Sequence, residues 1–188
     1  PLPYEEYPVV YNPESGFVWT ANNRVVGGKW LEVVGDGGSL QDIRAYQIRQ
    51  RLKKFGTVTP RDMLEIQLDD TATFFVRWQE HLLSLLEKHP SEKRDELATI
   101  LMGWNGRAAE DSSAYYVLRK VRDKAVQRVM ERILAPCFNA DADSFDYTNF
   151  DFEEPVWKIV TSKSTLLSDV TYQNWDEELL GYADEILD

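Results

Sequence analysis

The sequence contains one cysteine, Cys137, and two histidines, His81 and His89. A single cysteine excludes an intramolecular disulfide and a zinc site built from several cysteines. The histidines lie near the end of one expected helix with no obvious carboxylate partner, which does not fit a two-histidine zinc motif. We therefore predict no metal-binding or cofactor-binding residues within this chain.

Basic residues and long apolar runs are also scarce. The chain has 21 basic residues against 32 acidic ones, a formal charge of −11, and such a chain repels phosphate backbones. No apolar run approaches the length of a membrane span or of a signal-peptide core. Nucleic acid and membrane are therefore not expected partners. The 188 residues, 43% hydrophobic and 12% aromatic, are typical of one folded domain or a large piece of one.

A turn followed by an apolar run dominates the first part of the chain. Asn12-Pro13 and Ser15-Gly16 predict the turn, and the β-branched and aromatic residues 17–21 predict a short strand. Two asparagines, Asn22 and Asn23, follow the run. Asparagine is a common turn residue, so one interpretation of this pair is a second turn. The other is functional, because a carboxamide at a strand end can donate an N–H to a developing oxyanion.

An arginine stands on an otherwise apolar helical row in the next segment. Ser39 can cap a helix running to about Lys54, in which Leu40, Arg44, Ile48 and Leu52 recur every four residues. A guanidinium on a core-facing row is costly unless it is paired. The residues alone therefore predict a buried ion pair for Arg44, whereas Arg51, in the last turn, is expected to reach solvent or the terminal carbonyls.

Helical patterns continue through the rest of the chain. Caps and apolar spacing predict helices starting at Thr59 and Ser91 and running through residues 71–89 and 113–135, with a last helix from Asn174 onward. Asp69 and Asp70 suggest either an acid–base pair or, as we favour, a cap for the next helix at Asp70. We predict a mainly α fold with a short N-terminal β-strand region, divided into an extended region at residues 1–38 and a helical domain at residues 39–188.

Two weaker patterns have bland explanations. The N-terminal amine of Pro1 suggests a tautomerase, but Leu2-Pro3-Tyr4 does not begin a convincing strand. Residues 139–144 place oxygen-bearing side chains at alternate positions, as in a calcium loop. Ser144, however, stands where that loop needs glycine, and Phe150 where it needs an acid, so a solvated acidic loop is the preferred interpretation.

Several motifs in order resemble one enzyme family. They are Asn12-Pro13-x-x-Gly16 with Thr20-Ala21-Asn22-Asn23, Asp42-Ile43-Arg44-Ala45-x-x-Ile48, Gln67-x-Asp69 and Trp104-x-Gly106. Together they resemble the middle of the β-chain of the penicillin acylase family, whose members are amide hydrolases with an N-terminal nucleophile. The resemblance extends loosely from Asn12 to about Leu180, and two motifs in the right order and spacing are far more specific than either one alone.

The resemblance implies a role for two residues. Asn22 would donate to the tetrahedral oxyanion, and Arg44 would orient the nucleophile and its neighbours. The chain would be an internal segment of an αββα N-terminal-nucleophile hydrolase that acts on a small N-acyl amide. Penicillin, acyl-homoserine lactone and other N-acyl amides all remain open as substrates. Its protein partners would be the remaining α- and β-chain segments of the same precursor, in a periplasmic or secreted enzyme.

Two features depart from the family pattern. Members often bind calcium through an acidic ligand, but the corresponding position here is Val33, with Glu32 beside it, so calcium is expected at most in the complete enzyme. Residue 1 is Pro, which has no hydroxyl or thiol, so the nucleophile must come from outside this chain and the chain alone is expected to be inactive.

A non-catalytic helical binding or scaffold module is the alternative. The missing nucleophile and the abundant aromatic residues support it. A hydrolase segment would leave Asn22 and Arg44 facing one open, unfilled cleft, whereas a module without catalysis would bury or lose that cleft.

Overall fold

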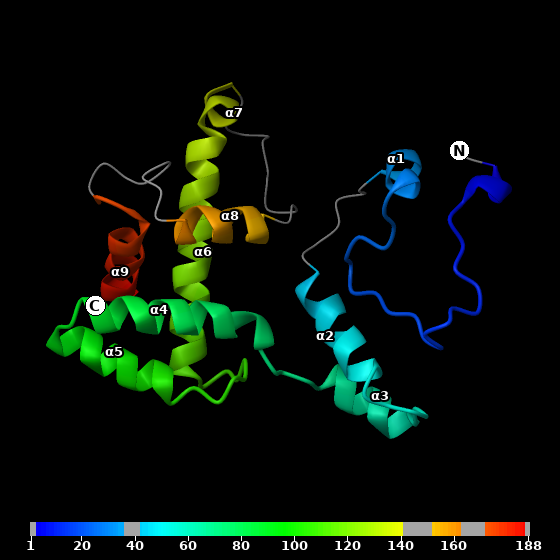
Figure 1. The fold of residues 1–188 in the computed structure, drawn as a ribbon, viewed down its shortest axis with the longest axis horizontal. Helices are drawn as coiled ribbons and strands as arrows, with labels where there is room; N and C mark the ends of the chain where they lie inside the picture. Colours follow the sequence, from blue (N-terminus) through cyan, green and yellow to red (C-terminus); the bar gives the residue numbers. More distant parts are fainter. Residues whose placement is uncertain (1–2, 36–41, 141–151, 163–171, 187–188) are drawn as a thin grey trace. The chain divides into compact units, whose positions relative to one another are not determined.

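The computed structural model describes residues 3–35, 42–140, 152–162 and 172–186. The chain forms two compact units, one of residues Pro1–Asp69 with Asp146–Asp151 (unit 1) and one of residues Asp70–Phe145 with Phe152–Asp188 (unit 2). The described chain is mainly helical, as predicted (Figure 1). The predicted domain boundary at residue 38 falls among residues that the structure does not describe and stays a prediction.

The described part of unit 1 contains four short helical elements. They are η1 (Tyr4–Glu6), α1 (Lys29–Val34), α2 (Ile43–Leu52) and α3 (Pro60–Gln67). The capping box at the start of α3 is formed, with Asp62 N donating to Thr59 Oγ1 and Thr59 N donating to Asp62 Oδ2. Helix α2 begins at Ile43 after Asp42, and the predicted cap, Ser39, lies outside the described residues.

The predicted N-terminal strand is wrong. Residues 17–21 are not a strand, no strand occurs in the described parts of the chain, and residues 29–34 are the helix α1. A strand requires a neighbouring backbone with which to pair. The apolar run instead contacts its surroundings through side chains, since the Phe17 and Trp19 rings lie 5.8 Å apart and the Arg49 guanidinium lies 5.1 Å from the Trp19 ring.

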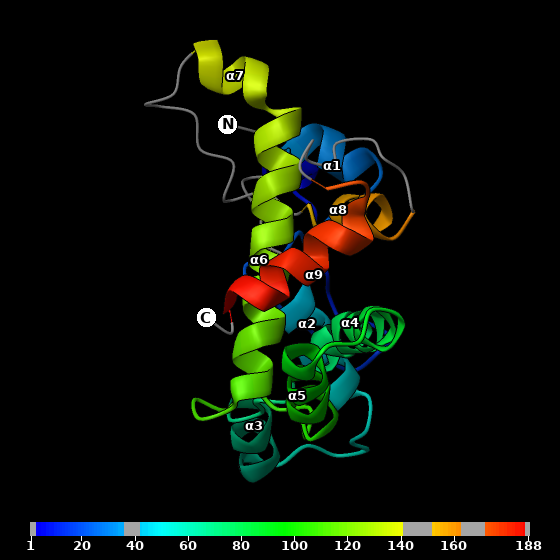
Figure 2. The same ribbon diagram turned by 90° about the vertical axis from the view of Figure 1, so that its left-hand side faces the viewer.

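Unit 2 is a bundle built on one long helix. Its elements are η2 (Thr73–Phe75), α4 (Val76–Lys88), α5 (Glu92–Met102), α6 (Ser113–Ile133), α7 (Ala135–Ala140), α8 (Glu153–Thr161) and α9 (Trp175–Ile186). Helices α4 and α5 form an antiparallel pair, and α8 and α9 cross α6 (Figures 1 and 2). Ser91 caps α5 as predicted, with its Oγ accepting from Arg94 N.

The core of unit 2 follows the predicted apolar stripe of α6. Buried positions on that helix recur every three or four residues: Ala114, Val117, Leu118, Val121, Ala125 and Val129. The helices that contact α6 also carry buried side chains, among them Leu85 of α4, Leu97 of α5, Val156 of α8 and Leu179 of α9. Burial of this apolar surface is the main source of stability for unit 2.

Among the described residues of unit 2, two carboxylates are buried, and both are paired. Glu153 accepts from Trp78 Nε1 at 3.0 Å and from Arg122 Nε at 2.8 Å. Glu178 accepts from Arg132 Nη2 at 2.6 Å and from the Tyr182 hydroxyl. Each glutamate lies in the first turn of its helix, where the helix dipole also favours a negative charge.

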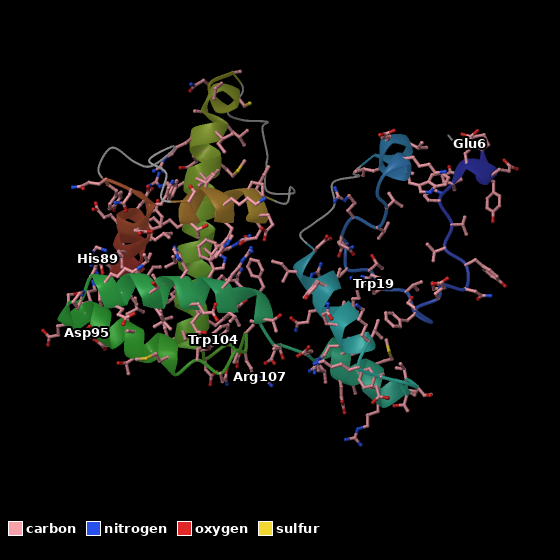
Figure 3. All side chains as sticks on the ribbon, viewed as in Figure 1. Glu6, Trp19, His89, Asp95, Trp104 and Arg107 are labelled. Carbon is pink, nitrogen blue, oxygen red and sulfur yellow. The ribbon has the colours of Figure 1, made fainter. Side chains whose placement is uncertain are left out.

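Asp70 does not cap the following helix. Its carboxylate instead accepts from Arg107 Nε at 3.2 Å and forms an ion pair in which Arg107 Nη2 lies 2.6 Å from Asp70 Oδ1. In the backbone, Ala72 N donates to Gly106 O and Ala108 N donates to Asp70 O. These interactions tie the start of unit 2 to the loop after α5. In that loop Trp104 Nε1 donates to Arg107 O at 2.9 Å (Figure 3), and Gly106 has a φ of 78°, which favours glycine.

Candidate functional site

Asn22 and Arg44 meet on unit 1 although 22 positions separate them. Arg44 lies in the first turn of α2, and its Nη2 donates to Asn22 Oδ1 at 3.1 Å and to Ala21 O at 3.0 Å. Both side chains are exposed. The structure therefore brings together the two residues that the sequence singled out, while their catalytic roles stay predictions.

The backbone around Asn22 forms a tight turn. Asn22 has a φ of 61°, in the left-handed region that asparagine tolerates better than most residues. The neighbouring Asn23 stabilises this turn, because its Oδ1 accepts from Ala21 N at 3.0 Å and its Nδ2 donates to Arg24 O at 2.9 Å. The interpretation of this pair as a turn is thus right, and it is compatible with a functional role for Asn22.

The contact with Arg44 fixes the orientation of the Asn22 carboxamide. A guanidinium carries only donors, so the amide atom that faces Arg44 must be the oxygen. The Nδ2 group, with its two N–H donors, is consequently the part of the carboxamide that remains to bind another acceptor. The positive charge on Arg44 draws electron density toward Oδ1, which makes these N–H groups better donors.

The environment of Arg44 differs from the sequence prediction, whereas that of Arg51 adds a partner to it. Arg44 is exposed and bonds to a carboxamide and a carbonyl, so the buried ion pair expected for it is wrong. The first turn of α2 places the Arg44 side chain toward the turn at Asn22 rather than into an apolar core. Arg51 reaches solvent as expected, since its side chain is 41% exposed, and it also pairs with Asp69 at 2.8 Å. Sequence spacing could not indicate these partners, because both lie on other segments.

Aromatic contacts hold the Asn22 segment against α2. Trp19 lies three positions before Asn22 (Figure 3). The guanidinium of Arg49 stacks on its ring, and the ring also packs against Phe17. A cation–π contact of this kind contributes about 0.5–1 kcal/mol at an exposed site. The segment and the helix are therefore joined by Arg49 as well as by Arg44.

The residues at the position of the family calcium ligand do not fit a metal. Val33 has no side-chain oxygen, and Glu32 is an exposed residue of the short helix α1. Within the described residues, no three His, Cys, Asp or Glu side chains cluster closely enough to hold an ion. The loop at residues 139–144 lies mostly outside those that the structure describes.

Comparison with protein families now identifies the chain. A family model described as penicillin amidase matches residues 1–180, nearly the whole length. The chain belongs to the penicillin amidase family. At the level of the family this implies an amide hydrolase. A comparison with curated proteins found no match.

The family assignment covers both units. Asn22 and Arg44 lie in unit 1, whereas the Trp104-x-Gly106 motif lies in the loop after α5 of unit 2.

Among the described residues, no helix is long and apolar enough to cross a bilayer. Sequence reasoning singled out Asp69 but missed its contacts with Gln47 and Arg51 of α2. The four-residue spacing of Gln47 and Arg51 places both on one face of α2 but does not indicate their partner.

Proposed function

We propose that this chain is the part of a penicillin acylase-type amidase that stabilises the tetrahedral oxyanion. In this proposal Asn22 Nδ2 donates to the oxyanion, and Arg44 is a positioning residue that holds the carboxamide. The observation that carries the proposal is the hydrogen bond from Arg44 Nη2 to Asn22 Oδ1, at 3.1 Å. It leaves the donor side of the amide available to a substrate oxygen.

The reaction proposed is hydrolysis of an N-acyl amide by an N-terminal nucleophile supplied outside these 188 residues. The hydroxyl or thiol of that nucleophile adds to the amide carbonyl, and its proton passes to the α-amine of the same residue. The carbonyl oxygen becomes an oxyanion, which accepts from Asn22. The C–N bond then breaks, the amine leaves with the proton, and water releases the acid from the acyl-enzyme.

The exposure of the site favours the hydrolase over the scaffold module. A donor must be accessible to the substrate, and both Asn22 and Arg44 are exposed. The left-handed backbone at Asn22 supports the same conclusion. Such a conformation costs about 1–3 kcal/mol and persists where surrounding contacts enforce it, as the hydrogen bonds of Arg44 with Asn22 and of Ala21 with Asn23 do here.

The proposed partners are the remaining α- and β-chain segments of the same precursor, in an αββα enzyme that is periplasmic or secreted. Unit 1 supports such a partner because many of its large apolar side chains are exposed. Tyr11 is 84% exposed, Val10 72% and Leu68 68%. Large exposed apolar side chains gathered on one unit are typical of a surface that another protein segment covers. The proposed substrates are small N-acyl amides, with penicillins and acyl-homoserine lactones among the candidates.

Replacement of Asn22 in the complete enzyme tests the proposal. Asn22→Asp retains an oxygen for Arg44 and tolerates the left-handed backbone, but it removes both N–H donors. Loss of one oxyanion donor costs about 10²–10³-fold in kcat. We expect that loss for Asn22→Asp, with KM little changed, when rates are normalised to titrated nucleophile.

Asn12 provides a matched control. It is also an exposed asparagine of unit 1 with a positive φ, 46°, so Asn12→Asp imposes the same chemical change in a similar backbone. This variant should keep the parent kcat. Full activity in Asn22→Asp, or an equal loss in Asn12→Asp, would refute the role proposed for Asn22.

A further inference from the structure

The carboxylate of Asp69, also on unit 1, binds α2, the helix that carries Arg44. Asp69 Oδ2 accepts from Arg51 Nε at 2.8 Å and from Gln47 Nε2 at 3.0 Å. The Asp69 side chain is only 5% exposed, although few side chains of unit 1 are buried. Hydrogen bonds to a buried carboxylate are stronger than those between neutral groups, so this is a firm attachment for α2.

The residues that contact Asp69 lie on the same face of α2 as Arg44. Positions 44, 47 and 51 have the spacing i, i+3 and i+7. At about 100° and 1.5 Å per residue, Arg44 and Arg51 lie within about 20° of each other around the axis and about 10 Å apart along it. One stripe of the helix thus contacts the Asn22 turn at one end and Asp69 at the other.

Asp69 is itself held by the end of α3. Leu68 N donates to Leu64 O at 2.9 Å, Asp69 N donates to Ile66 O at 3.3 Å, and α3 packs against α2. Asp69 is therefore a fixed point relative to which α2 can be oriented.

We propose that Asp69 is a positioning residue for the oxyanion donor. By holding Gln47 and Arg51, it sets the rotation and translation of α2 at which Arg44 reaches both Asn22 Oδ1 and Ala21 O. This inference rests on the proposed function of Asn22. Without the carboxylate, α2 is free to rotate, Arg44 leaves the carboxamide, and the Nδ2 donors lose their orientation toward the oxyanion.

The test is a double-mutant analysis in the complete enzyme, with kcat normalised to titrated nucleophile. A displacement of about 1 Å at a reacting group costs up to about 10²-fold, so Asp69→Ala should lower kcat roughly 10- to 100-fold and leave KM nearly unchanged. Asp69→Asn keeps one acceptor oxygen and the same volume, and its loss should be smaller. In an Asn22→Gly background, which has no carboxamide to orient, Asp69→Ala should lower kcat by a much smaller factor.

Asp62→Ala is the matched control. It removes an aspartate that stabilises the same helix, α3, but bonds to Thr59 rather than to Gln47 or Arg51. It should leave kcat near the parent value. The inference is overturned if Asp69→Ala lowers kcat by the same factor with and without Asn22, or if Asp62→Ala lowers kcat as much as Asp69→Ala does. Either result would mean that the loss of activity comes from impaired folding. If Asp69→Ala does not fold, the same comparison with Asp69→Asn decides. A full-activity Asn22→Gly variant would instead refute the proposed function.

Discussion

The two units of this protein are stabilised in different ways. Unit 2 buries a large apolar core, including Trp78, Leu85 and Trp175, whereas the buried apolar side chains of the described part of unit 1 are Ala45 and Leu52. In unit 1 the arginines of α2 make the long-range contacts: Arg44 with Asn22, Arg49 with Trp19 and Arg51 with Asp69. The candidate site therefore lies on the unit whose geometry depends on polar contacts rather than on a core.

This difference indicates a division of roles. A packed helical core fixes its side chains by excluded volume, so it tolerates few alternative arrangements. Polar and cation–π contacts at a surface are individually weak, so the positions of the site residues depend on several of them acting together. We expect substitutions in unit 2 to change stability and substitutions around α2 to change catalysis.

The largest stability effect is expected from a buried ion pair of unit 2. Arg132→Met would leave Glu178, which is 1% exposed, without its guanidinium partner. Removal of one partner of a buried pair costs about 3–5 kcal/mol. Urea unfolding monitored by circular dichroism measures this loss. Arg128→Met, one turn earlier and paired with Glu131 at the surface, should cost about 0–1 kcal/mol, and equal losses would contradict the account.

A comparison of two leucines tests the contrast between the units directly. Leu85 in unit 2 is 1% exposed, and Leu64 in unit 1 is 52% exposed. Leu85→Ala creates a cavity and should lower the free energy of unfolding by about 2–5 kcal/mol. Leu64→Ala should change it by about 0.5 kcal/mol or less. A large loss for Leu64→Ala, measured in the same unfolding assay, would show that unit 1 has a core of its own.

A smaller, pH-dependent effect is expected from unit 2 alone. Burial lowers the pKa of His81, with Asp176 acting in the opposite direction and Lys88 adding to the effect. A lowered pKa in the folded state means that folding favours the neutral imidazole. This stability is fully present above the unfolded value of about 6.5 and is lost as the pH falls toward the folded pKa.

The control for His81 is the other histidine of the chain. His81→Gln should flatten the dependence of stability on pH below about 6.5, while His89→Gln, at an exposed position, should retain it. Unit 1 contains no histidine, so hydrogen exchange in α2 and α3 should not respond over this range. Hydrogen exchange that depends on pH in α2 but not in α4 would contradict this prediction.

Local signals predicted much of the fold. Thr59 and Ser91 begin helices because their side chains bond to backbone N–H groups a few positions away, and the stripe of α6 repeats within one segment. Asn22 and Arg44 were found through the order and spacing of two motifs. The contacts of Arg51 with Asp69 and of Asp70 with Arg107 join distant segments, and no local pattern encodes such pairs. The predicted strand failed because local β propensity does not supply a neighbouring strand.

The central claim is that the Asn22 carboxamide binds the oxyanion. A crystal structure of the complete enzyme, with its nucleophile bound to a phosphonate that mimics the tetrahedral intermediate, tests it most directly. We predict that Asn22 Nδ2 lies about 2.7–3.1 Å from the phosphonate oxygen, with Arg44 still on Asn22 Oδ1. An Asn22 amide turned away from that oxygen, with other donors in its place, would contradict the account.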